Sequence, residues 1–194
     1  MGRHTSASCK FCRREGEKLF LKGEKCYTEK CPYVRRSYAP GQHGKIQVRV
    51  TEYQIRLREK QKARRTYGLM ERQFANYFEK ASARKGATGE KLLELLERRL
   101  DNVIYRLGFV TSRQAGRQIV RNGGVLVNAR KVNIPSYEVK TGDMIKISPK
   151  IANLAKAALE KFPDRVTPAW LSLTGEVEGK ILSVPKRTDI DANI

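Results

Sequence analysis

The sequence predicts an α+β fold, in which a mainly helical domain carries a small inserted module of two helices and a short sheet, after a cysteine-rich N-terminal segment. Three observations predict it. All cysteines lie within residues 9–31, apolar residues recur at helical spacing through residues 51–107, and short alternating segments separated by turns follow residue 122. We therefore expect an N-terminal segment (1–45), a mainly helical domain (46–92 plus 161–194) and the inserted module (93–160).

The N-terminal segment contains two cysteine pairs, Cys9-x2-Cys12 and Cys26-x4-Cys31. Gaps of two to four residues let a tight turn present two thiolates to one tetrahedral ion. The spacing therefore predicts a zinc knuckle, in which all four cysteines hold one structural Zn²⁺ ion. Two disulfides, an iron–sulfur cluster and an empty site remain open alternatives, as does replacement of one thiolate by either histidine of the chain.

Three helices are predicted in the middle of the chain. Thr51 suits the N-cap of the first, which ends near Gly68, and its thin apolar stripe predicts a helix that lies mostly outside a core. Two further amphipathic helices follow, the second of them continuous over residues 89–108. Their stripes predict the core positions Phe74, Tyr77, Phe78, Ala81, Leu92, Leu93, Leu96, Leu100, Val103, Ile104 and Leu107.

The next helix begins after Ser112, a suitable N-cap, and ends at residues 122–124. Arg113, Arg117 and Arg121 are four residues apart, so a helix places all three on one face. The other face carries Ala115, Ile119 and Val120. A cationic stripe beside an apolar seam is typical of a docked helix that contacts phosphate groups.

Short strands are predicted to complete the module. Val125, Val127 and Val132 alternate with polar residues around the turn at residues 128–129, and a second alternating set flanks the turn at residues 141–143. This second set consists of Tyr137, Val139, Met144, Ile145 and Ile147.

The charge of the chain indicates its class of partner. Lys and Arg number 40 against 20 Asp and Glu, which gives a formal charge of +20 and favours a polyanion such as nucleic acid. Residues 161–194 are balanced, with five basic and five acidic side chains, so we expect them to pack against protein. A basic surface can also lie on anionic lipid, but the apolar runs are far below the ~20 residues that span a bilayer, and no membrane association is expected.

The sequence resembles the family of bacterial ribosomal small-subunit protein four, in its zinc-bearing four-cysteine type. The resemblance covers nearly the whole chain in order. It is carried by the segments APGQHG, LREKQKARRTYG, LERRLDNVIYRLGF, TSRQAGRQIV, GGVLVNARKVNIPSY, VKTGDMI and WLSL.

The resemblance implies a cytoplasmic structural constituent of the small ribosomal subunit, with no small-molecule substrate. It implies a primary 16S rRNA-binding protein that nucleates assembly of the 5′ domain and contributes to translational accuracy. Further implied properties are contact with ribosomal small-subunit protein five, contact with messenger RNA where it enters the subunit, and repression of the protein's own operon messenger RNA.

The predicted RNA-binding residues fall into three groups. In the N-terminal half, charge and ring chemistry select Lys10, Arg13, Arg14, Lys22, Arg35, Arg36, Tyr38, Gln42 and His43. The helix after Thr51 adds Arg56, Arg58, Lys60, Lys62, Arg64 and Arg65, although such a run is often only a solvated face. The resemblance implies Arg99, Ser112, Arg113, Gln114, Arg117, Arg121, Asn122 and Asn128 in the module, with Lys45 and Arg49 near messenger RNA.

Two other classes of protein, an enzyme and a DNA-binding regulator, would require sequence features of their own. An enzyme that carries the same module, such as a pseudouridine synthase or a tyrosyl-tRNA synthetase, needs a second domain with catalytic groups, and no such motif is evident. A zinc-finger DNA regulator needs a symmetric dimer face, and no heptad pattern is evident. We therefore expect no catalytic residues.

Overall fold

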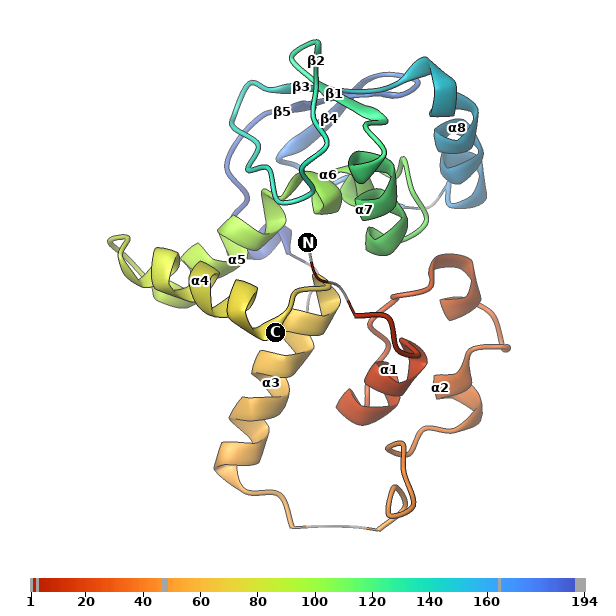
Figure 1. Ribbon diagram of the computed structural model, residues 1–194, viewed down its shortest axis with the longest axis vertical. Helices are drawn as coiled ribbons and strands as arrows, with labels where there is room; N and C mark the ends of the chain where they lie inside the picture. Colours follow the sequence, from red (N-terminus) through yellow and green to blue (C-terminus); the bar gives the residue numbers. More distant parts are fainter. Residues whose placement is uncertain (1, 3, 47–48, 164, 191–194) are drawn as a thin grey trace. The chain divides into compact units, whose positions relative to one another are not determined.

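The computed structural model describes residues 2, 4–46, 49–163 and 165–190 (Figure 1). The fold is α+β. The chain forms two compact units, one of residues up to Phe74 and one that begins at Ala75. The three-part division expected from the sequence stays a prediction, and its last four residues, 191–194, lie outside the described chain.

The first unit is helical. Its elements are α1 (Cys9–Glu15), η1 (Gly23–Cys26), α2 (Pro32–Arg35) and α3 (Glu52–Thr66). The predicted N-cap of α3 is confirmed, because the Thr51 hydroxyl accepts a hydrogen bond of 3.3 Å from the Gln54 amide. Within α3 only Ala63, Arg64 and Thr66 are buried, so the prediction of a helix mostly outside a core is also confirmed.

The helix α4 (Glu71–Ser82) follows. Phe74 and Ala81 are buried as predicted, but the prediction for Phe78 is wrong, because its side chain is 52% exposed. The inward-facing stripe of α4 runs through Phe74, Tyr77 and Ala81, and the Tyr77 hydroxyl accepts a hydrogen bond from Arg99. Phe78 lies at the edge of this stripe.

The continuous helix predicted over residues 89–108 is divided into α5 (Thr88–Glu97) and α6 (Leu100–Arg106). The backbone at Arg99 is extended and forms a bridge with Glu138. The Leu100 amide donates to the Tyr137 carbonyl oxygen at 2.9 Å, and the Val139 amide donates to the Arg98 carbonyl oxygen at 3.0 Å. These long-range bonds replace helical bonds, which is why the apolar periodicity did not reveal the break.

The remaining elements form the sheet and its covering helices. They are α7 (Arg113–Arg121), β1 (Val125–Val127), β2 (Arg130–Lys131), β3 (Met144–Ile147), η2 (Pro149–Ile151), α8 (Ala152–Lys161), β4 (Leu171–Gly175), β5 (Glu178–Ile181) and η3 (Arg187–Asp189). The five strands are antiparallel in the order β2-β1-β3-β5-β4. The strands β4 and β5, in the segment assigned to the helical domain from the sequence, therefore extend the sheet of the module.

One core holds the second unit together. It joins α6, α7 and the sheet, and it includes Trp170, Leu171 and Ile181 from the charge-balanced C-terminal segment. The expectation that this segment packs against protein is confirmed for these three side chains, which are at most 4% exposed, whereas Leu173, Leu182 and Val184 are exposed. The predicted seam of α7 is also confirmed, with Val120 fully buried and Ala115 and Ile119 packed against the core.

Gly116 lies at the contact of α7 with α6, and replacing it with alanine is expected to destabilise the second unit by about 1–3 kcal/mol. A Cβ atom there would lie 2.7 Å from the Asp101 carbonyl oxygen and 3.3 Å from Val110 Cγ2. The expected sign is opposite to the usual gain of about 0.5–1 kcal/mol for alanine over glycine inside a helix. Urea unfolding followed by the fluorescence of Trp170, the single tryptophan, measures the change.

The matched control is Gly89→Ala in α5, where nothing lies within 4 Å of the added carbon. That variant is expected to be as stable as the parent or slightly more stable. Equal stability of the two variants would contradict the packing derived for Gly116.

Candidate nucleic-acid interface

The helix α7 carries the predicted arginine stripe. Its N-terminus is fixed by Ser112, whose hydroxyl accepts a hydrogen bond of 3.2 Å from the Ala115 amide. Arg113 is held in place, because Nε donates to Asn102 Oδ1 at 2.7 Å and the guanidinium lies 4.5 Å from the centre of the Tyr105 ring. Further along the helix, Arg117 is half-buried and Arg121 is exposed. The stripe therefore begins at an anchored guanidinium and extends to an exposed one.

The ends of this face are formed by exposed side chains of α7 and the neighbouring hairpin. Gln114 and Asn122 are exposed, and so is Asn128 in the β1–β2 turn, where its φ is +50°. Asn128 Nδ2 donates to Asp143 Oδ1 at 2.8 Å, and Asn128 Oδ1 accepts from the Met144 amide at 2.9 Å. Both side-chain groups of Asn128 thus hold the turn against β3.

Lys131 belongs beside this face but was missed from the sequence. It is exposed, and its side chain covers Gly123, since a Cβ added at Gly123 would lie 2.1 Å from Lys131 Cε. The register of the β1–β2 hairpin, in which Lys131 pairs with Leu126, places Lys131 beside this face. The turn predicted at residues 128–129 was the sequence signal from which this position could have been inferred.

Arg99 is engaged inside the protein. It is 2% exposed, and its Nε and Nη2 donate to the two oxygens of Asp101 at 3.1 and 2.8 Å. A third bond of 2.8 Å joins Nη1 to the Tyr77 hydroxyl. Burial alone would lower the pKa of Arg99, but Asp101 and Tyr77 outweigh it and raise the pKa above its ordinary value. This guanidinium and the buried Ser112 hydroxyl both have structural partners, and their contact with RNA stays a prediction.

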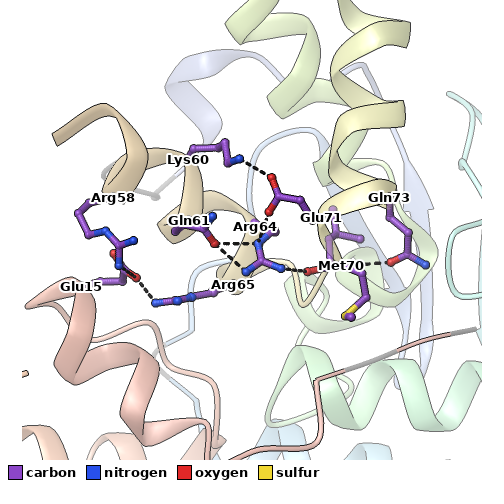
Figure 2. A network of polar contacts seen from close by, with 10 residues as sticks. Glu15, Arg58, Lys60, Gln61, Arg64, Arg65, Met70, Glu71 and Gln73 are labelled. Carbon is purple, nitrogen blue, oxygen red and sulfur yellow. Dashed lines mark hydrogen bonds and ion pairs between the residues drawn. The ribbon is translucent and has the colours of Figure 1, made fainter. Parts of the chain in front are cut away.

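The six cations predicted along α3 are all paired with carboxylates. Arg58 lies 3.5 Å from Glu15, and Lys62 lies 2.6 Å from Glu17. Arg65 also pairs with Glu15, whose side chain is 1% exposed. Figure 2 shows this carboxylate facing both arginines. Burial raises the pKa of Glu15 above its ordinary value, while Arg65 and Arg58 act in the opposite direction.

The same pairing continues toward the C-terminal end of α3 (Figure 2). Glu71 interacts with both Lys60 and Arg64, and the hydrogen bond from Lys60 lowers the pKa of Glu71. Arg64 also donates to Gln61 Oε1 at 2.9 and 2.6 Å. At the other end of the helix, Arg56 lies 3.3 Å from Glu52 at an exposed position. Most of these cations hold the first unit together, and their contact with RNA stays a prediction.

The N-terminal cations have a different environment. Arg13 donates to the Tyr38 and Ala39 carbonyl oxygens at 3.0 and 3.4 Å, and Arg14 donates to that of Pro40 at 3.1 Å. These bonds attach the loop after α2 to α1. The remaining predicted residues of this region are exposed, namely Lys10, Lys22, Arg35, Arg36, Tyr38, Gln42, His43, Lys45 and Arg49.

All four cysteines are free, and Cys12, Cys26 and Cys31 are buried. Burial raises the pKa of Cys12 and Cys26, and the nearby thiols raise it further. Backbone groups act in the opposite direction, since the Lys22 amide donates to Cys26 Sγ at 3.4 Å and a hydrogen bond at Leu19 lowers the pKa of Cys12.

Among the described residues, no group of three or more His, Cys, Asp or Glu side chains is arranged to hold a metal ion. The donor set still fits zinc in its chemistry, because the four thiols interact electrostatically with one another, three of them are buried, and two accept backbone hydrogen bonds. His4 instead packs edge-on against Phe11, with ring centres 4.8 Å apart. Burial lowers the pKa of His4, and Arg64 and Arg65 lower it further.

In the second unit, a helix pair packs on an antiparallel sheet, and arginines lie along the second helix. This is the architecture of a small RNA-binding domain. Residues 98–145 match the family described as the S4 domain, and residues 3–97 match the Ribosomal protein S4/S9 N-terminal domain. No helix in the described part of the chain is long and apolar enough to cross a bilayer.

Curated relatives match the chain over all or nearly all of its length. "Small ribosomal subunit protein uS4" of Dictyoglomus turgidum is 53% identical over 195 residues, covering 100% of this chain and 95% of the relative. Proteins of the same name from Desulforamulus reducens and Solidesulfovibrio magneticus are 54% and 52% identical, and the matches cover 100% and 98% of this chain and 95% and 93% of those relatives. The chain belongs to the small ribosomal subunit protein uS4 family.

Proposed function

We propose that this protein is a structural constituent of the small ribosomal subunit that binds 16S ribosomal RNA directly, nucleates assembly of the 5′ domain and contributes to translational accuracy. The observation that carries the proposal is the arginine face of α7, presented by an S4 domain in a chain of the uS4 family with a formal charge of +20. Family membership also supports a cytoplasmic location on the ribosome and a role without catalysis.

Binding works through phosphates and 2′-hydroxyl groups, because the deep groove of A-form RNA excludes side chains. The exposed Arg121, Gln114 and Asn122 suit such contacts, and anchored Arg113 restricts where the RNA backbone approaches α7. The N-terminal cations supply a second set of phosphate contacts.

The further partners rest on the resemblance. We propose contact with ribosomal small-subunit protein five, with messenger RNA where it enters the subunit, and with the protein's own operon messenger RNA. Exposed Lys45 and Arg49 support the second of these, since both present unburied positive charge.

A competition experiment tests the main proposal. The purified protein is bound to the 5′-domain junction of 16S ribosomal RNA and challenged with unlabelled junction RNA or with duplex DNA of equal length. The junction RNA is expected to compete at far lower concentration than the DNA. Equal competition by RNA and DNA would show that the protein binds any polyanion through its charge alone, and would overturn the proposal.

We also propose that Cys9, Cys12, Cys26 and Cys31 bind one structural Zn²⁺ ion. The protein would then belong to the zinc-bearing four-cysteine type of its family. The cysteine-bearing segment of the first unit has a small apolar core around Cys12, Leu19 and Leu21, and such segments often depend on a metal for folding energy. Backbone N–H groups directed at thiolates favour the charged form that a metal needs.

Metal analysis of purified protein is expected to find about one zinc per chain, in line with a site of four thiolates. Cys26→Ser is expected to lose the metal and to broaden the amide NMR signals of residues 9–35, because the segment loses its fixed contacts. His43→Ala is the control and should keep the metal, since His43 is exposed. Native NMR signals in metal-free wild-type protein would contradict the structural role.

A further inference from the structure

A cavity of about 290 Å³ lies within the first unit. Its lining residues are Arg13, Lys25, Lys30, Pro32, Arg35 and Arg36. Five of the six are cationic and none is acidic. Lys25 and Lys30 are not among the predicted RNA-binding residues.

The charges of this cavity differ from those of α3. No ion pair joins any of its five cations to a carboxylate in the described part of the chain, whereas α3 has a carboxylate for every predicted cation. Arg13 is oriented by carbonyl oxygens, which fix its direction without neutralising it. Like charges held together destabilise the folded state, and a bound anion offsets that repulsion.

The chain positions these residues next to the cysteines. Arg13 follows Cys12, Lys25 precedes Cys26, and Cys31 lies between Lys30 and Pro32. Those three cysteines are buried. Burial of the cysteines restricts the backbone positions of the neighbouring lining residues. The cavity is therefore lined by residues that flank buried positions of the chain.

Size and charge favour a ligand that contains several phosphate groups. A phosphate group has four oxygens, each about the size of a water molecule of about 30 Å³, and fills less than half of the cavity. The remaining space suits a ribose or base, for which a proline ring and guanidinium planes are good stacking surfaces. Five positive charges also exceed the one or two negative charges of a single phosphate, while successive phosphodiesters of a bent strand supply one each.

We propose that this cavity binds one unpaired nucleotide of RNA, holding its flanking phosphates with Lys25, Lys30 and the three arginines, and its sugar or base beside Pro32. The proposal rests on the proposed function, because the strand is part of the ribosomal RNA that the whole protein binds.

The test compares two double variants of the full-length protein that remove equal charge. Lys25→Ala with Lys30→Ala changes the cavity, and Lys80→Ala with Lys85→Ala changes two exposed lysines of the second unit outside the predicted interface. Circular dichroism checks that both variants are folded. The cavity variant is expected to bind the 5′-domain RNA about tenfold or more weakly and to lower the salt slope of binding by about 2, while the control changes little.

A second arm separates RNA phosphate from free phosphate. At equal ionic strength, inorganic phosphate is expected to weaken RNA binding by the wild-type protein more than chloride does, and this difference should vanish in the cavity variant. Equal losses in the two double variants would overturn the cavity proposal and leave the proposed function intact. Tight binding of inorganic phosphate with unchanged RNA affinity of the cavity variant would also overturn it. A wild-type protein that does not bind the junction would instead overturn the proposed function.

Discussion

Replacing Glu97 with alanine is expected to lower the free energy of unfolding of the second unit by about 3–5 kcal/mol, the usual cost of breaking a buried ion pair by removing one partner. Glu97 is fully buried at the C-terminal end of α5. Its carboxylate accepts hydrogen bonds from Arg106 Nε and Nη2 at 3.0 and 2.9 Å and from Asn102 Nδ2 at 2.8 Å. The substitution leaves the Arg106 guanidinium, itself 9% exposed, without this counter-charge.

Urea unfolding followed by Trp170 fluorescence measures this change, because Trp170 lies in the same core as α6. Glu79→Ala is the matched control, at an exposed position of α4, and should stay within about 0.5 kcal/mol of the parent. Glu97→Leu combined with Arg106→Met should recover much of the loss, since apolar replacement of both partners is often neutral. A Glu97→Ala protein as stable as the control would show that the pair is not buried in solution.

Binding to the ribosomal RNA junction is expected to weaken by about 10³–10⁵ when salt is raised from about 50 to 200 mM, because phosphate contacts release condensed counterions. The chain carries the excess charge that this requires, and α7 presents part of it at fixed positions. Filter binding across a salt series measures the slope.

Arg117→Ala with Arg121→Ala is expected to reduce that slope by about 2 if each side chain contacts one phosphate. Lys80→Ala with Lys85→Ala again serves as the control of equal charge. Affinity that hardly changes across the salt series would contradict a phosphate-dominated interface, whatever the effect of the variants.

Features set by neighbouring residues could be predicted from the sequence. Thr51 and Ser112 act as N-caps as expected, and the spacing of Arg113, Arg117 and Arg121 falls on one helix. These features depend on backbone groups three or four residues away, so the local sequence contains all the information they need.

Features set by distant residues could not be predicted. The cations of α3 looked available because few acids lie nearby, yet Glu15 pairs with Arg65 across 50 residues. The extended backbone at Arg99 depends in the same way on the bridge to Glu138, and the pairing of β3 with β5 joins segments that the sequence pattern had separated.

The placement of β5 between β3 and β4 has a consequence for synthesis of the protein. Translation delivers β1, β2 and β3 well before residues 178–181, so a nascent chain exposes the open edge of β3 until β5 is made. The sheet of the second unit can therefore close only after β4 and β5 have been synthesised, which places its completion late in translation.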